Sequence, residues 1–388
     1  MDFSLSADQQ NIRDAILKHC SQFTDEYWLE RDRSGVFPHD FVESLVERGW
    51  LGIAMPTQYG GSGLGITEAA VMMQAIAESG AAMTGASSVH IPVFSVQPVV
   101  LFGTQEQKQR ILPEVVSGKD RVCFAVTEPN AGLNTTEIKT RAERRDGGYL
   151  VNGEKIWIST AQVANKMLLL ARTTPLEQVK KKTEGLSLFY TDLDRSKIEV
   201  RLIHKMGRHA VDSNMLFIQD LWVPEEDRIG AESAGFKSLL HGLNPERVLV
   251  AAEAIGIGRN AIARAARYAR ERIVFNRPIG MNQGIQHPLA KCWAQLEAAN
   301  LMVMKAATLF DKGLDCGVEA NTAKYLAGEF AFEACHTAML TLGGMGYAQE
   351  YHIERLLREV LITRIAPVSP HMILNFLAEK VLELPRSY

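Results

Sequence analysis

The sequence predicts an α+β protein in which a β-rich middle region lies between two helical regions. Its 388 residues are enough for two or three domains with a sizeable core. Apolar residues recur at helical spacing near both ends, whereas short β-rich runs separated by turn residues fill the middle. We therefore expect an N-terminal helical domain at residues 1–120, a middle β-domain at 121–235 and a C-terminal helical bundle at 236–388.

The N-terminal region has the apolar pattern of amphipathic helices. Ile12, Ile16 and Leu17, for example, would share one helical face. The pattern is interrupted by the glycine-rich residues 59–63, which indicate a turn.

The middle region reads as a series of short strands. The expected strands are residues 121–127, 141–145, 149–151, 155–159, 167–171, 186–190, 200–204 and 215–223. Asp146-Gly147-Gly148 and Asn152-Gly153 predict hairpin turns, because Asn, Asp and Gly tolerate the positive φ that such turns require.

The C-terminal region is rich in Ala and Leu at helical spacing. Asn244 is a good N-cap and Pro245 suits the first helical position, so we expect a long helix to begin there. Two further long helices are expected at about 283–312 and 316–341, followed by shorter ones.

The composition excludes several classes of protein. The 42 basic and 45 acidic residues leave a net charge of −3, and no basic block is interleaved with aromatic residues, so nucleic acid is not an expected ligand. With 46% hydrophobic and 22% charged residues the chain is globular in composition, and we expect no membrane insertion. The five cysteines are scattered without a CxxC pair, which favours buried thiols and no metal site. Because a secretory signal pattern is also lacking, we expect a cytoplasmic protein.

Common nucleotide and hydrolase motifs are absent from the sequence. No GxGxxG follows a strand, and GxxxxGK[ST], HExxH and GxSxG do not occur. Two local strings remain as candidates for a cofactor site, residues 123–132 (CFAVTEPNAG) and 342–347 (LGGMGY). Small residues in such strings let the backbone approach a ligand closely, although an ordinary strand exit and an ordinary helix end would look the same.

These strings belong to an ordered series of motifs along the chain. The series comprises residues 3–10 (FSLSADQQ), 49–53 (GWLGI), 59–63 (YGGSG), 102–108 (FGTQEQK), 126–129 (VTEP), 152–159 (NGEKIWIS), 271–272 (ER) with Phe275 and Gln283, 342–347 and 354–358 (ERLLR). In order and density the series resembles the acyl-CoA dehydrogenase family over essentially the whole chain. The resemblance implies a helical N-terminal domain, a β-barrel-like middle domain and a C-terminal four-helix bundle.

The resemblance also implies FAD as the cofactor. Val126 and Thr127 would meet the pyrimidine edge of the flavin, and Trp157 and Ser159 would lie along the isoalloxazine ring near N5. Gly132 would belong to the same cofactor-binding loop.

A second set of residues would bind the FAD of a neighbouring subunit. This set consists of Arg272 and Gln283 with the backbone of Gly343 and Gly344. The resemblance therefore implies a homodimer or homotetramer.

The reaction that the resemblance implies is the α,β-dehydrogenation of an acyl-CoA thioester to the trans-2-enoyl-CoA. It requires a carboxylate over Cα, and the electrons would pass to an electron-transfer flavoprotein, as in fatty acid metabolism. In most members the carboxylate follows an arginine-acid pair, matched here by Arg358-Glu359, but this chain has Pro367 at the expected position. A minority, including isovaleryl-CoA and some long-chain dehydrogenases, carry the base in a Glu-Arg pair that resembles Glu246-Arg247.

We therefore expect Glu246 to be the catalytic base and Arg247 to lie at the substrate. The alternative is that Glu246 is an ordinary acid in the first turn of a helix, where the helix macrodipole stabilises negative charge.

Pro367 has a further consequence for the reaction. In the family the main-chain N–H at this position helps to bind the thioester oxygen, and proline has no N–H. Loss of one such donor typically costs about 10²–10³ in rate, unless Val368 supplies it. An enoyl-CoA reductase or oxidase of the same fold, or a catalytically silent subunit, therefore remain as alternatives to a dehydrogenase.

Overall fold

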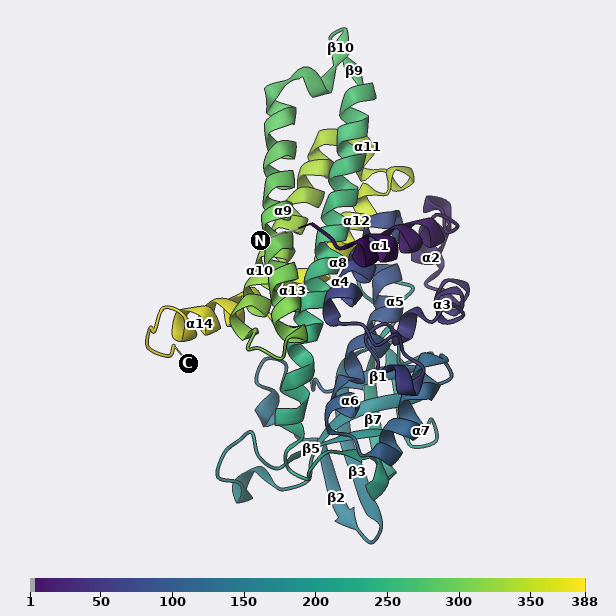
Figure 1. Cartoon of the computed structure of the whole chain (residues 1–388), viewed down its shortest axis with the longest axis vertical. Helices are drawn as coiled ribbons and strands as arrows, with labels where there is room; N and C mark the ends of the chain where they lie inside the picture. Colours follow the sequence, from purple (N-terminus) through teal and green to yellow (C-terminus); the bar gives the residue numbers. More distant parts are fainter. Residues whose placement is uncertain (1–3, 388) are drawn as a thin grey trace.

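The computed structural model describes residues 4–387, so Phe3, the first residue of the opening motif, lies outside the described part. The chain forms an elongated molecule with a helical upper part and a sheet at its lower end (Figure 1). The order of elements, helices then strands then helices, is the order predicted from the sequence.

Seven helices form the N-terminal region. They are α1 (Ala7–Cys20), α2 (Asp25–Ser34), α3 (His39–Val46), α4 (Ile66–Ile76), α5 (Ala82–Ser95), α6 (Gln97–Phe102) and α7 (Gln105–Val116). The first begins at a capping box, in which Ser6 and Gln9 satisfy each other's backbone N–H groups.

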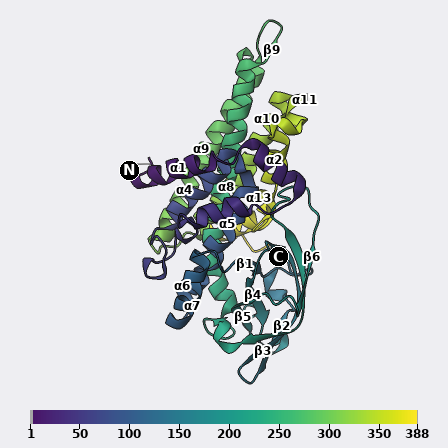
Figure 2. The same ribbon diagram turned by 90° about the vertical axis from the view of Figure 1, so that its right-hand side faces the viewer.

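One mixed sheet of eight strands forms the middle region (Figure 2). The strands are β1 (Val122–Ala125), β2 (Arg141–Arg145), β3 (Gly148–Ser159), β4 (Lys166–Arg172), β5 (Leu186–Asp192), β6 (Ile198–Leu202), β7 (Ser213–Pro224) and β8 (Arg228–Ile229). Their order is β6-β7-β3-β2-β4-β5-β8, and β1 pairs in parallel with β4. The predicted turn at Asp146-Gly147-Gly148 joins β2 to β3, and Gly147 adopts a φ of 75° there.

The Asn152-Gly153 pair is not a hairpin turn, so that prediction was wrong. β3 continues through the pair as a single strand, and its register against β7 shifts between Val151 and Gly153. The Asn152 side chain accepts a hydrogen bond from the backbone N–H of Asp220 at 2.9 Å, and a Cβ on Gly153 would lie 2.4 Å from Thr140 Oγ1. The same residue types that suit a turn therefore form an irregularity inside a strand where two backbones approach closely.

The C-terminal region contains three long helices and several short ones. They are α8 (Gly235–Glu271), α9 (Gln283–Asp311), α10 (Gly317–Leu342), α11 (Gly344–Tyr347), α12 (Ile353–Val360), α13 (Ile362–Ile365) and α14 (Pro370–Lys380). Between α8 and α9 the two-residue strands β9 (Ile273–Val274) and β10 (Arg277–Pro278) form the tip of the molecule (Figure 1).

The long helix α8 begins well before the predicted Asn244, and Pro245 lies inside it. Its start is set by close packing on the sheet, because a Cβ on Gly235 would lie 2.5 Å from backbone atoms of Ser187 and Leu188. The helix start predicted at Asn244-Pro245 is therefore wrong. Glu246 consequently lies in the helix interior, which removes the first-turn explanation for this acid.

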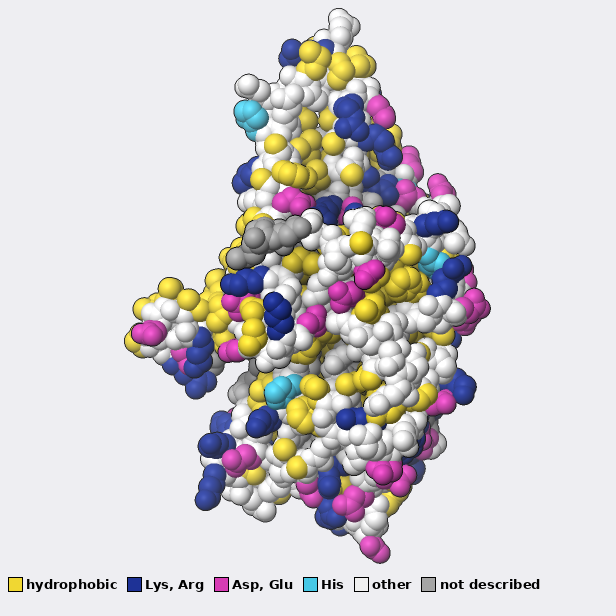
Figure 3. Space-filling view, in the orientation of Figure 1, with side chains coloured by type: hydrophobic (Ala, Val, Ile, Leu, Met, Phe, Trp, Pro, Cys, Tyr) yellow, Lys and Arg dark blue, Asp and Glu magenta, His cyan; other side chains and the backbone are white. Residues whose placement is uncertain are grey.

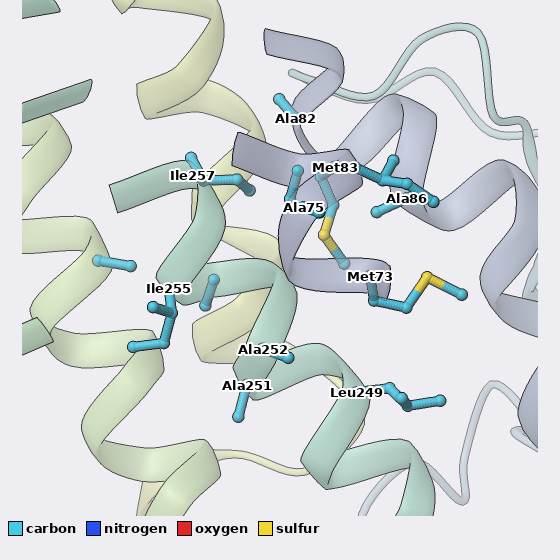
Figure 4. Packing of buried hydrophobic residues seen from close by; sticks show 14 of the residues in the cluster. Met73, Ala75, Ala82, Met83, Ala86, Leu249, Ala251, Ala252, Ile255 and Ile257 are labelled. Atoms are coloured by element: carbon cyan, nitrogen blue, oxygen red, sulfur yellow. The ribbon is translucent and has the colours of Figure 1, made fainter. Parts of the chain in front are cut away.

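The largest core joins the N-terminal and C-terminal helices. Met73 of α4 and Met83 of α5 pack against the buried face of α8 around Leu249 and Ile255 (Figure 4). All five cysteines are free and buried among the described residues, as predicted.

Candidate active site

Glu246 lies on α8 with one carboxylate oxygen withdrawn from solvent. Its side chain is half-buried, and Oε2 has no hydrogen-bond partner within residues 4–387. Burial raises the pKa of Glu246 to about 7, an effect that the positive charges of His90, Arg247 and Lys324 only partly offset. A carboxylate with a pKa near neutrality and a free oxygen is suited to exchange a proton with a ligand.

Arg247 lies beside the predicted base. Its Nη1 donates a hydrogen bond to Asn244 Oδ1 at 3.0 Å, while its Nε is buried and unpaired among the described residues. Burial lowers the pKa of Arg247. The unpaired donor is available to a ligand group that accepts a hydrogen bond.

A buried ion pair lies seven residues further along α8. Glu253 Oε1 lies 2.8 Å from Nδ1 of His90 on α5, and both side chains are buried. Burial lowers the pKa of His90, but the Glu253 carboxylate outweighs this and leaves the pKa above its usual value. No motif in the sequence points to this pair, although Glu253 follows Glu246 by seven residues and so lies on the same helical face.

The predicted flavin residues of the middle region lie close together. Thr127 follows β1, and its carbonyl accepts the backbone N–H of Ile156 in β3 at 2.9 Å. Trp157 has a φ of 62° and remains 56% exposed, and Ser159 ends the strand. In the described part of the chain the Thr127 hydroxyl has no hydrogen-bond partner.

A buried lysine holds these two segments in register. Lys155 Nζ donates to the carbonyl of Val126 at 3.0 Å, to that of Leu170 at 2.8 Å and to Glu128 Oε1 at 2.9 Å. Burial lowers the pKa of Lys155 to about 8. Burial raises the pKa of Glu128, but Lys155 and the hydrogen bonds reverse this and hold it below its usual value. The motifs containing Lys155 and Glu128 were recognised, but their pairing was not predicted.

Arg208 connects this strand end to α5. Its guanidinium donates to Ser159 Oγ at 3.1 Å and to Ser87 Oγ at 3.0 Å. Arg208 adopts a φ of 58°. The sequence carried no signal for this bridge, because its three members are far apart along the chain.

Other predicted cofactor residues lie elsewhere. Gly132 is in an exposed loop with no other group within 4 Å of a Cβ placed on it. Arg272 and Gln283 are exposed at the tip of the α8–α9 hairpin, and Gly343 and Gly344 are exposed at the end of α10. Figure 1 places this tip and the sheet at opposite ends of the molecule, so one chain does not bring the two predicted sets together.

Lys324 binds the backbone of the segment around Pro367. The Lys324 ammonium is buried and donates to the carbonyls of Val368 at 2.6 Å and Arg364 at 3.2 Å. Burial lowers its pKa to about 8. No sequence motif indicates this contact, and the Lys324 ammonium is close enough to Glu246 and Arg247 for their charges to act on it.

The residues near the sheet fit the flavin ring of FAD. An exposed indole offers a flat apolar surface, and the free Thr127 hydroxyl beside it offers a hydrogen bond to a heterocycle edge. The half-buried Glu246 of α8, with its unpaired Oε2, acts electrostatically on His90, and so does Arg208, which donates to Ser159 Oγ.

Comparison with known proteins identifies the family. The N-terminal, middle and C-terminal domains of acyl-CoA dehydrogenases match residues 6–119, 123–221 and 233–382. Acyl-CoA dehydrogenase FadE12 of Mycobacterium tuberculosis is 36% identical over 100% of this chain and 99% of its own length. The caffeyl-CoA reductase–Etf complex subunit CarC of Acetobacterium woodii is 33% identical over 89% of this chain and 90% of its own. The FAD complex of PigA superimposes with a TM-score of 0.93 at 26% identity, over 98% of this chain and 99% of that one.

The chain belongs to the acyl-CoA dehydrogenase family. It is an FAD-dependent oxidoreductase that acts on a CH–CH group, and the predicted fold class is confirmed.

Proposed function

We propose that this enzyme dehydrogenates an acyl-CoA thioester between Cα and Cβ with Glu246 as the base. The observation that carries the proposal is the unpaired, buried Oε2 of Glu246 on α8. Bound FAD would supply the two-electron acceptor for the hydride that leaves Cβ. Glu246 takes the proton from Cα, so the product is the trans-2-enoyl-CoA.

Other residues of the chain prepare this step. Arg247 and Lys324 place positive charge beside Glu246 and favour its ionised form before the proton is taken. Trp157 and Ser159 would orient the flavin ring, and Arg208 holds Ser159 against α5. Pro367 offers no N–H to the thioester oxygen, so activation of Cα depends on other donors.

The proposal is tested by adding a panel of straight and branched acyl-CoAs to the FAD-loaded enzyme without oxygen. A dehydrogenase bleaches its flavin with at least one of these thioesters and releases the corresponding enoyl-CoA. A protein that binds FAD but is bleached by none of them refutes the proposal.

An enoyl-CoA reductase is the second candidate, because a caffeyl-CoA reductase subunit is among the relatives that match nearly the full chain. The missing N–H at Pro367 also argues for altered chemistry. Reoxidation of the chemically reduced enzyme by an enoyl-CoA, without bleaching of the oxidised enzyme by the saturated thioester, would favour the reductase.

The rate of flavin reduction is expected to rise with pH through about 7, where Glu246 titrates. The raised pKa keeps the carboxyl protonated below this pH, and a protonated carboxyl cannot accept the Cα proton. Anaerobic kcat/KM measured from pH 5.5 to 7.5 should therefore fall about tenfold per pH unit on the acid side. A flat profile across that range would exclude Glu246 as the base.

We further propose a cytoplasmic homotetramer, or a homodimer as the minimal unit, that gives its electrons to an electron-transfer flavoprotein in fatty acid metabolism. The five free buried thiols support a reducing compartment. Hydrophobic side chains gather at the β9–β10 tip (Figure 3), where Phe275 is 94% exposed beside Ile273 and Met281. Such a patch is typical of an association surface.

Replacing Arg272 with alanine is expected to weaken FAD binding about 10- to 100-fold, because a charged hydrogen bond to the neighbouring subunit's cofactor is lost. FAD affinity is measured by fluorescence titration, and Arg267→Ala, an exposed arginine in the last turns of α8, serves as the control. Mixing Arg272→Ala subunits with Trp157→Ala subunits should restore tight binding at one site of each hybrid pair. Hybrids that bind no more FAD than the separate variants would contradict sharing of the cofactor.

A further inference from the structure

The ion pair between His90 and Glu253 is buried but lies outside the reacting groups. It joins α5 to α8, with Nδ1 of His90 2.8 Å from Glu253 Oε1. The second oxygen, Glu253 Oε2, is buried and unpaired among the residues that the structure describes. A buried carboxylate held by a single partner is costly, so a role beyond packing is expected.

The geometry of α5 and α8 places the ion pair relative to the proposed base. Glu246 and Glu253 are seven residues apart on one face of α8, a rise of ~10 Å. On α5, His90 lies one turn after Ser87, which Arg208 ties to the flavin-side Ser159. The same faces of α5 and α8 thus carry the proposed base, the link to the flavin residues and the ion pair. The charges of His90 and Glu253 are close enough to act on Glu246.

An acyl group whose Cα lies at Glu246 would extend between these two helices. The ion pair of His90 and Glu253, called the bridge below, joins α5 to α8 across that path, at a rise of ~10 Å from Glu246 along α8. An alkyl chain reaching the bridge would meet charged atoms and would offer no hydrogen bond to Glu253 Oε2, which has no partner among the described residues. Both packing and polarity oppose a long apolar chain.

We propose that the bridge between His90 and Glu253 is a polar floor of the acyl site and restricts the substrate to short-chain acyl-CoA thioesters. This inference rests on the proposed function for the place of Cα. It concerns chain length and is independent of the direction of the reaction.

The test compares butyryl-CoA with octanoyl-CoA, by anaerobic flavin bleaching of the FAD-loaded enzyme and by calorimetric binding to its Glu246→Gln variant, in which flavin reduction is slowed. The wild type should prefer the four-carbon thioester by at least about 100-fold in kcat/KM, because misfit of even one methylene is worth about 10- to 200-fold. Binding affinities should differ in the same direction.

The decisive variant is His90→Ala with Glu253→Ala, which removes both charges together and opens the space. Its preference for butyryl-CoA should fall at least tenfold, with octanoyl-CoA gaining. The matched control removes another ion pair of α8, Arg259→Ala with Glu297→Ala, whose atoms are 2.6 Å apart on the α9 side, and should leave the preference unchanged. FAD content and thermal midpoint show that each variant is folded.

The two proposals fail in different ways. Equal use of both thioesters by the wild type, or an unchanged preference in the alanine pair, overturns the floor and leaves the dehydrogenase standing. Tight binding of butyryl-CoA but not octanoyl-CoA without any bleaching overturns the dehydrogenase and leaves the floor standing.

Discussion

Replacing Glu246 with glutamine is expected to lower the rate of flavin reduction by a saturating acyl-CoA about 10²- to 10⁴-fold, the contribution of a positioned general base. Glutamine keeps the size of the side chain but cannot accept the proton from Cα. The rate is measured by stopped-flow absorbance of the FAD-loaded protein without oxygen. FAD content should be unchanged, because the predicted flavin residues lie on other elements.

The control for this substitution is Glu333→Gln. Glu333 is an acid of α10 that pairs with Lys291 at the surface, 2.7 Å away. In the Glu333→Gln variant the substrate should reduce the flavin at the wild-type rate. A Glu246→Gln enzyme as fast as the wild type would show that the proton goes to another group.

Replacing Lys155 with methionine is expected to lower the free energy of unfolding by about 3–5 kcal/mol and to release FAD. The substitution leaves the Glu128 carboxylate buried without its cation, and breaking one side of a buried pair typically costs this much. It also removes the hydrogen bonds that Lys155 donates to the Val126 and Leu170 carbonyls. The segment after β1, which is expected to contact the flavin, is then no longer held in place. Urea unfolding and flavin absorbance after gel filtration measure the two effects.

A surface pair of the same sheet provides the comparison. Lys166→Met removes the partner of Asp192, whose side chain is largely exposed, and should cost less than about 1 kcal/mol. If Lys155→Met were no more destabilising than Lys166→Met, the buried pair of Lys155 and Glu128 would not be what holds the segment after β1 in place.

The sequence predicted most of the architecture because periodicity is a local property. The helices expected at 283–312 and 316–341 correspond to α9 and α10, and the strand expected at 141–145 is β2. Two predictions were wrong, the hairpin turn at Asn152-Gly153 and the helix start at Asn244. In both places a segment far away in the sequence determines the local structure. Gly153 and Gly235 both lie where another backbone approaches within 2.6 Å of a Cβ position, a demand that one stretch of sequence does not reveal.

Part of the candidate site could be proposed from the sequence. Motifs pointed to Glu246 as the base and to the residues expected near the flavin, because their types and order could be compared with a family, and these roles stay predictions. The bridges made by Arg208, His90 and Lys324 join segments far apart in the chain, and a buried cation looks the same in sequence as a surface one. In the folded chain the charges of His90 and Lys324 lie close enough to act on Glu246.

The separation of the two predicted FAD-binding sets has a thermodynamic consequence for the proposed assembly. If each cofactor bridges two chains, binding of FAD and association of subunits are linked equilibria, and each strengthens the other by the same factor. Dilution would then release flavin as well as subunits by mass action. The enzyme would retain its FAD, and hence its yellow colour, only at protein concentrations at which its subunits are associated.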